Sequence, residues 1–385
     1  MFVQPTLYLL LLLFAVVVYW STPQRCWRFR ATFLTVVSIV LVTLIVPALG
    51  VALLASSALA HGYKYVRSVT AARWPAALFV CVQIALMILP DLTDLSALHQ
   101  LFALAGMSYF TLRNIGYVID VYKCKCDVGL LDLLFLNSFF PTYSAGPVEN
   151  IKTFNAESCN TSFSAEEFVF GLCRILIGIL KFYWLADQIV DPFIAGHFPR
   201  TENNIAEADS GQIVAMALVL WLSLYLSFSG YADLAIGSSK LFSLKIRENF
   251  RYPFLAVNIQ DFWQRWNISI MNFVSEFVYL NFVRTTGLRI TGLFLVFLVI
   301  GMWHHVSWTY LFWAVAHGSA MALTVMARRT PRYQQFQTWI AARRYVAWPL
   351  TVVSWVLTLA FVSVVSAVAN SPSLSAGVSF LQGVF

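Results

Sequence analysis

Two adjacent histidines are the residues of this chain best suited to chemistry. They lie in Trp303-His304-His305, between the apolar stretches Leu293 to Val299 and Trp308 to Met326. Polar side chains at membrane depth are costly and are retained mostly for function. An imidazole accepts a proton readily near neutral pH. We therefore predict that His304 is a catalytic base; a hydrogen-bonded structural histidine is the alternative.

The composition places these histidines in a membrane protein. Of the 385 residues, 59% are hydrophobic and 11% are charged, and the mean hydropathy is +0.73. Soluble domains carry about 25% charged residues, so a soluble fold is excluded. The apolar runs are long and continuous, as helices that cross a bilayer require, whereas barrel strands alternate apolar and polar residues. The sequence predicts an all-α polytopic protein of about ten or eleven membrane helices, with residues 1–385 in one domain.

The expected spans differ in their regularity. The run Leu7 to Trp20 has no basic segment before it and no small-residue cleavage site, so we expect a retained first span and not a signal peptide. The run Ala31 to Ala60 is too long for one span. Because Pro47 and Gly50 lie near its middle, we expect a tight helical hairpin bent there; a single tilted helix is the alternative.

Four stretches depart from simple spans. Pro141 to Pro147 follows the short run Leu130 to Phe140 and predicts a re-entrant or interfacial element packed inside protein. The polar stretch from Glu149 to Ala165 is expected at the surface. Asn258 to Ile270 is aromatic and amphipathic, which favours a helix that lies along the membrane or dips into it. The acidic stretches 90–94 and 191–209 are expected on the outer side.

The net charge of +7 indicates orientation in the bilayer more than a ligand. Arg and Lys cluster in short loops, as the positive-inside rule expects, and no soluble basic face is left to bind nucleic acid. The six cysteines are scattered. The pair Cys124 and Cys126 has no second half, so we predict no metal site.

Six short motifs follow one another between about residue 132 and residue 318. They are Phe140-Pro141-Thr142-Tyr143-Ser144-Ala145-Gly146-Pro147, Phe228 to Gly237, Glu248-Asn249-Phe250, Phe262-Trp263-Gln264-Arg265-Trp266, Trp303-His304, and Trp313 through His317-Gly318. In this order they resemble the membrane-bound O-acyltransferase family. The closest resemblance is to the bacterial branch that acylates cell-surface polymers, by alginate-type O-acetylation or by D-alanyl transfer to teichoic acid.

The resemblance implies a fold and a pair of catalytic positions. Helices would surround a thin centre with re-entrant elements and a tunnel, and His304 would be the catalytic residue. The family's Arg-Trp-His stands here as Arg265-Trp266-Asn267, and its Trp-His-Gly as Trp303-His304-His305. An asparagine is no base, but Asn267 can donate a hydrogen bond to an acyl oxygen or orient a substrate.

Other side chains are candidates for contact with substrate. They are Trp303, His305, Asp233, Tyr143, His317 and Arg265. Alternative roles stay open: Asp233 is expected to pair with an arginine, and Arg265 to anchor the interfacial helix. His305 could replace His304, although neighbours on a helix point about 100° apart. For His317, packing and substrate lining are equally open.

The expected function is transfer of an acetyl or D-alanyl group to hydroxyls of an extracytoplasmic polymer. The donor would be a cytoplasmic thioester, acyl-coenzyme A or an acyl carrier protein, with no bound cofactor. Partners implied are a periplasmic acyl-relay protein and a small membrane peptide, in the cytoplasmic membrane of a bacterium. One alternative, favoured by Asn267, is a lipid or protein O-acyltransferase. Another is an inactive scaffold or a transporter, although a transporter is expected to show repeat symmetry.

Overall fold

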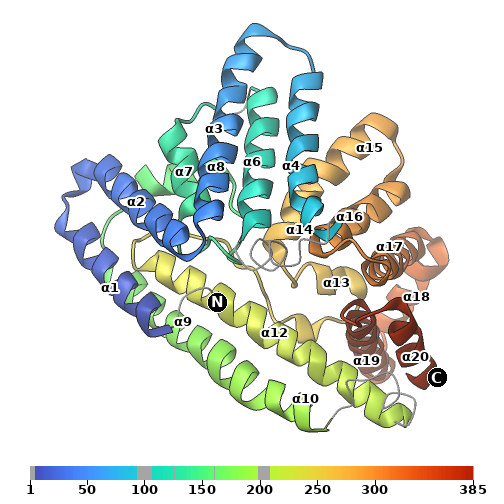
Figure 1. Ribbon diagram of the computed structural model, residues 1–385. Helices are drawn as coiled ribbons and strands as arrows, with labels where there is room; N and C mark the ends of the chain where they lie inside the picture. Colours follow the sequence, from blue (N-terminus) through green and yellow to red (C-terminus); the bar gives the residue numbers. More distant parts are fainter. Residues whose placement is uncertain (1–4, 93–105, 125, 160, 198–208, 385) are drawn as a thin grey trace. The chain divides into compact units, whose positions relative to one another are not determined.

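A computed structural model describes residues 5–92, 106–124, 126–159, 161–197 and 209–384 of the chain (Figure 1). Within these ranges the regular structure is helical and no strand occurs, which confirms the predicted all-α class. Among the described residues, five helices are long and apolar enough to cross a membrane: Gln24–Ile45, Ala165–Ile194, Ser210–Lys240, Trp308–Arg329 and Arg344–Ala369. Shorter apolar helices accompany them. The sequence predictions for residues 93–105 and 198–208 lie outside the described ranges.

The chain folds into two compact units. The first unit holds Met1–Ile179 and Gly230–Glu248, and the second unit holds Leu180–Ser229 and Asn249–Phe385. One helix, α12 (Ser210–Lys240), runs through the boundary without a break. The stretch 229–237 therefore lies inside a continuous helix.

In the first unit, α6 is the helix against which α3, α4 and α7 pack. The elements of this unit are α1 (Pro5–Ser21), η1 (Gln24–Cys26), α2 (Trp27–Ile45), α3 (Pro47–Val69), α4 (Trp74–Leu92), α6 (Met107–Tyr122), α7 (Leu130–Ser138), α8 (Ile151–Cys159), α9 (Ala165–Ile179) and the last part of α12. Nearly every side chain of α6 is buried, because α3 and α4 both pack against it (Figure 1).

Two sequence predictions for the first unit are confirmed, and a third is wrong. Val46 has an extended backbone that separates α2 from α3, so the long run does break at Pro47. The segment 139–147 is a buried turn after α7. Glu149, however, is only 3% exposed, because its carboxylate accepts a hydrogen bond of 2.7 Å from the backbone N–H of Arg247. Its polarity indicated the surface, but its partner lies far along the chain.

Glycines bring α9 and α12 into backbone contact in the first unit. A Cβ atom at Gly171 would lie 2.8 Å from the carbonyl oxygen of Gly237, and one at Gly178 would lie 2.7 Å from that of Gly230. Both pairs are too close for any side chain. Small residues allow membrane helices to approach in this way, so the two helices meet along a glycine seam (Figure 1).

An ion pair lies between the two glycine contacts. Arg174 is halfway between Gly171 and Gly178, and Asp233 is near the middle of the facing segment. An Nη2–Oδ1 distance of 2.6 Å joins them. The same guanidinium makes two hydrogen bonds of 2.9 Å to the carboxylate of Glu248. The prediction that Asp233 pairs with an arginine is confirmed.

The second unit contains the remaining helices. They are η2 (Leu180–Val190), α10 (Asp191–His197), the first part of α12, η3 (Pro253–Leu255), α13 (Ile259–Trp263), α14 (Ile268–Val274), η4 (Ser275–Tyr279), α15 (Leu280–Thr286), α16 (Arg289–His304), α17 (Trp308–Arg329), α18 (Pro331–Ala341), α19 (Arg344–Ala369) and α20 (Leu374–Val384).

Two predictions for the second unit are corrected. The stretch 258–270 is not one amphipathic helix, because a turn at residues 264–267 separates α13 from α14. Residues 191–197 form α10 and continue the preceding helix, where the sequence placed the start of a polar loop. The helical hairpin of α16 and α17 is as the apolar runs predicted.

Candidate active site

A cavity of about 170 Å³ in the second unit brings three predicted site residues together. His304, Asn267 and His317 line it. They come from the end of α16, the turn before α14 and the middle of α17. Most of the remaining wall is aromatic, with tryptophans at positions 221, 263, 266 and 313. The cavity is therefore a small apolar chamber with a few polar groups, as small-molecule sites commonly are.

His304 is placed by the hairpin between α16 and α17. It is the last residue of α16, and Ser307 caps α17 by accepting a hydrogen bond of 3.3 Å from the backbone N–H of Tyr310. This tight turn stacks the His304 ring on Tyr310, with centroids 5.6 Å apart, and brings it 6.1 Å from Trp313. The His304 side chain is exposed and makes no hydrogen bond within the described part of the chain. Both ring nitrogens are thus open to a substrate.

The neighbour of His304 is oriented differently. His305 has extended backbone angles, φ −168° and ψ 139°, so the helix has already ended there. The expected 100° separation on a helix does not apply to this pair. Neither His305 nor Trp303 belongs to the cavity wall, so of the three consecutive residues only His304 faces the chamber.

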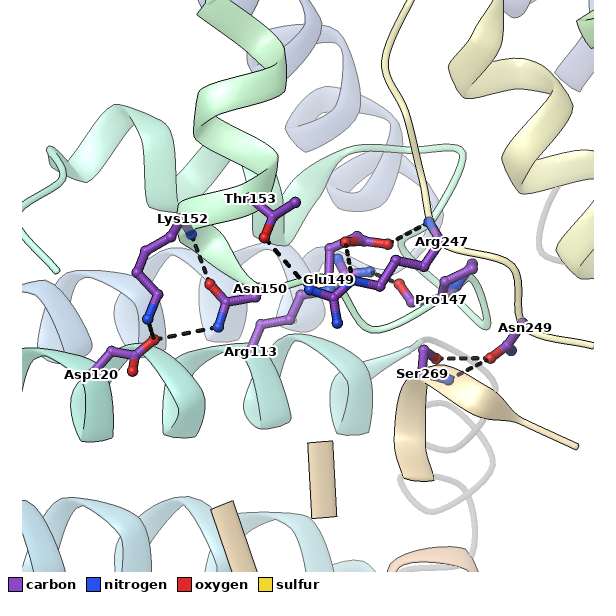
Figure 2. A network of polar contacts seen from close by, with 10 residues as sticks. All are labelled: Arg113, Asp120, Pro147, Glu149, Asn150, Lys152, Thr153, Arg247, Asn249 and Ser269. Atoms are coloured by element: carbon purple, nitrogen blue, oxygen red, sulfur yellow. Dashed lines mark hydrogen bonds and ion pairs between the residues drawn. The ribbon is translucent and has the colours of Figure 1, made fainter. Parts of the chain in front are cut away.

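Asn267 occupies a turn that needs an unusual backbone. Its φ of 45° lies in the left-handed region, which asparagine adopts more readily than most residues. Asn249 holds the following residues: its Oδ1 accepts hydrogen bonds from the backbone N–H of Ser269 (3.1 Å) and from its hydroxyl (2.8 Å) (Figure 2). The Asn267 side chain is 6% exposed, and its Oδ1 has no hydrogen-bond partner among the described residues.

His317 differs from His304 because its tautomer is fixed. It is 1% exposed, and Nε1 of Trp263 donates a hydrogen bond of 3.3 Å to its Nδ1. An indole N–H can only donate, so Nδ1 is the acceptor and Nε2 of the neutral ring carries the proton. His317 can therefore offer an N–H to the chamber, while His304 is the histidine free to take a proton.

Trp221 is a further polar group on the wall that the sequence did not reveal. It lies on α12, is 4% exposed and lines the same cavity. Its Nε1 is buried without a hydrogen-bond partner in the described ranges. A buried N–H without a hydrogen-bond acceptor costs about 1–3 kcal/mol. A ligand that accepts a hydrogen bond from this N–H would remove that cost. A tryptophan in an apolar run carries no local signal of such a state.

The other predicted site residues have different places. Arg265 pairs with Asp261 at 2.7 Å and donates a hydrogen bond to the carbonyl of Arg251, so it holds the turn before Asn267. Tyr143 and Asp233 belong to the first unit. No group of three or more His, Cys, Asp or Glu within the described ranges could hold a metal ion.

Comparison with known proteins gives the family. The model of the membrane-bound O-acyltransferase family matches residues 125–367. The chain is 29% identical over 259 residues to the probable alginate O-acetylase of Pseudomonas aeruginosa, covering 66% of this chain and 48% of the relative. It is 27% identical over 323 residues to the peptidoglycan O-acetyltransferase of Helicobacter pylori, covering 74% and 57%.

A third relative belongs to another group of polymer-modifying enzymes. The chain is 25% identical over 284 residues to the teichoic acid D-alanyltransferase of Bacillus subtilis, covering 69% of this chain and 68% of the relative. The aligned segment spans about half the length of the alginate relatives. The family match covers well over half of this chain and includes the whole cavity except Asn370 and Ala369 at its edge. This chain belongs to the membrane-bound O-acyltransferase family.

Proposed function

We propose that this protein transfers a short acyl group from a cytoplasmic thioester to a hydroxyl of an extracytoplasmic polymer. The observation that carries the proposal is His304, a histidine with both ring nitrogens open, on the wall of a chamber that also holds Asn267 and His317. The three relatives above are named for acetyl or D-alanyl transfer. Acetyl and D-alanyl are accordingly the two groups proposed here.

His304 acts as the base in the proposed reaction. A ring nitrogen takes the proton of the acceptor hydroxyl while the hydroxyl oxygen bonds to the acyl carbon. The C–S bond of the thioester then breaks, the new ester is released, and the proton passes from the imidazolium to the leaving thiolate. The adjacent rings of Tyr310 and Trp313 pack against the imidazole and fix its orientation at the chamber wall.

Neutral donors on the wall stabilise the developing oxyanion. The candidates are Nε1–H of Trp221, Nε2–H of His317 and the side-chain amide of Asn267. Donors that are already positioned for the oxyanion act more strongly in such a site than in bulk water, because they need no reorganisation during the reaction. The chamber of about 170 Å³ favours a short acyl group over a long fatty chain, which distinguishes the proposal from lipid-chain transfer.

The proposal extends to the setting of the reaction. The protein would lie in the cytoplasmic membrane of a bacterium and receive its acyl group from acyl-coenzyme A or from a carrier protein. A periplasmic acyl-relay protein could take the group onward, and a small membrane peptide could assist. These partners follow from the family resemblance, and the polymer acceptor follows from the polymers for which the relatives are named.

Transfer by the purified protein in lipid vesicles tests the function. Acetyl-coenzyme A, a D-alanyl carrier thioester and palmitoyl-coenzyme A are supplied in turn, and thioester loss is measured. We expect turnover with a short donor, and a decrease of about 10²–10⁴-fold in His304→Ala at an unchanged melting temperature. His305→Ala is the matched comparison, because that residue adjoins His304 but does not line the chamber. Turnover of palmitoyl-coenzyme A alone, or an undiminished rate in His304→Ala, contradicts the proposal.

A further inference from the structure

A second hollow, in the first unit, is apolar and much larger than the chamber around His304. It is a groove of about 860 Å³ between α3 and α4. The α3 wall presents Ala55, Ala58 and Gly62, which the spacing of three and four residues places on one helix face. The opposite wall carries large α4 side chains such as Leu78 and Val82, which are 56% and 43% exposed.

The groove is open because nothing in the described chain fills the space beside the small residues. A Cβ atom at Gly62 would meet no heavy atom within 4 Å. Gln83 carries the one amide on the wall, and it is 1% exposed, with its Oε1 accepting a hydrogen bond of 3.0 Å from Ser56. The lining therefore makes mainly hydrocarbon contacts with any molecule that occupies the groove.

The length of the groove matches one leaflet of a bilayer. Its α3 wall runs from Ala55 to Val66, which at 1.5 Å per residue is about 16 Å. Half of a hydrocarbon core of about 30 Å is about 15 Å. A single lipid tail, which spans one leaflet, therefore fits along the groove, whereas a transmembrane helix would extend far beyond it.

One end of the groove carries positive charge. The loop after α3 ends at Arg73, whose exposed side chain makes no hydrogen bond or ion pair in the described part of the chain. Lys64 pairs with Asp127, and Arg67 donates to the carbonyl of Tyr122 at 3.0 Å. Trp74, on the groove wall, is 67% exposed, as tryptophans at the membrane interface are. The basic end thus lies at headgroup level.

We propose that this groove seats one acyl chain of an anionic phospholipid, with the phosphate at Arg73. Hydrophobic contact holds the tail between α3 and α4, and the arginine selects a headgroup with net negative charge. The site is independent of the chamber that contains His304, and its function would be to bind a particular lipid to the first unit.

Photo-crosslinking in lipid vesicles tests whether the groove binds a phospholipid tail. The full-length protein is reconstituted in phosphatidylcholine with a small fraction of phosphatidylglycerol that carries a diazirine on one tail, and labelled peptides are identified by mass spectrometry. We expect labelling concentrated on residues 55–66 and 74–83. If exposed apolar faces elsewhere, such as that of α9, are labelled as strongly as the groove, the proposal is overturned.

Two variants separate the tail from the headgroup. Gly62→Leu fills open space without a clash, and leucine favours a helix over glycine by about 1 kcal/mol, so the fold is retained while labelling in the groove is lost. Val51→Leu, at an exposed α3 position outside the groove, is the matched control. Arg73→Gln is expected to lower the preference for phosphatidylglycerol over a phosphatidylcholine probe about fivefold. Unchanged labelling in Gly62→Leu contradicts binding of the tail in the groove. An unchanged preference in Arg73→Gln contradicts selection of the headgroup by Arg73.

Discussion

The buried charges of the first unit and the neutral polar groups of the chamber in the second unit differ in their partners. In the first unit, buried charges are bound to the chain itself. Arg113 is 2% exposed, and its Nη atoms donate to the backbone carbonyls of Leu136 (2.8 Å) and Thr142 (2.9 Å). They also donate to the backbone carbonyl of Pro147 (3.2 Å; Figure 2). The cation thereby holds the buried turn after α7 in place. Here the polar interactions fix the fold.

In the second unit, the chamber has neutral polar groups with open bonding capacity. Nε1 of Trp221 and Oδ1 of Asn267 are buried without partners among the described residues, and no Asp, Glu, Lys or Arg lines the wall. A group paired within the chain contributes to folding, whereas an unpaired group in a cavity contributes when a ligand arrives. Substitutions of the paired charges in the first unit should therefore change stability, and those around the chamber should change activity.

The largest effect on stability is expected at the ion pair in the glycine seam. Asp233→Ala leaves Arg174, whose side chain is 18% exposed, with only Glu248 as a partner. Breaking a fully buried pair costs about 3–5 kcal/mol; we expect about 2–3 kcal/mol here, because Arg174 is partly exposed and Glu248 remains. Unfolding in detergent, followed by circular dichroism against temperature or denaturant, measures the change.

The double variant Arg174→Met with Asp233→Leu is the control for the seam. It removes both charges and keeps apolar volume, so its stability should lie near that of the wild type or above it. If Asp233→Ala unfolds at the wild-type temperature while transfer activity is lost, Asp233 serves the substrate and the comparison between the units fails.

A smaller effect, and one on activity alone, is expected at Trp221. Trp221→Phe keeps an aromatic ring on the wall but removes the N–H. Loss of one oxyanion donor typically lowers turnover by about 10²–10³-fold, and we expect about 10²-fold because His317 and Asn267 remain. The melting temperature should be unchanged or slightly higher, since an unpaired buried donor is gone.

Turnover and unfolding measured on the same preparations test this prediction. Trp184→Phe is the matched control, because Trp184 is 57% exposed and lies outside the chamber wall. Equal turnover in Trp221→Phe and the wild type would show that the buried N–H plays no part in transfer.

The smallest effect separates the backbone of Asn267 from its amide. Alanine is strained at a φ of 45°, so Asn267→Ala should destabilise the protein by about 1–2 kcal/mol. Asn267→Gly removes the same amide without that strain. Denaturant unfolding should therefore rank the glycine variant close to the wild type and the alanine variant below it. If the amide assists transfer, both variants lose turnover to the same degree; a loss in Asn267→Ala alone would assign the role to the backbone.

Features set by neighbouring residues were predictable from the sequence. The apolar runs predicted the helices, and Pro47 predicted the break after α2. The position of His304 at the end of an apolar helix followed from the same pattern. Each of these depends on local chemistry that a short window of sequence contains.

Features set by distant partners were not predictable. The burial of Glu149 depends on Arg247, and the alignment of residues around Asn267 depends on Asn249. The state of the Trp221 N–H depends on what surrounds it in space. A polar residue in a polar stretch, or a tryptophan in an apolar one, has the same local signature whether or not it finds a partner.

The glycine seam also sets an order of events during synthesis. Arg174 enters the membrane on α9, and Asp233 follows about sixty residues later, which at about 5–20 residues per second corresponds to roughly 3–12 s. Throughout that interval the guanidinium lacks the carboxylate that neutralises it in the finished protein. The nascent α9 must therefore keep this cation in contact with water, lipid phosphate or the insertion machinery until α12 emerges and the two helices close on each other.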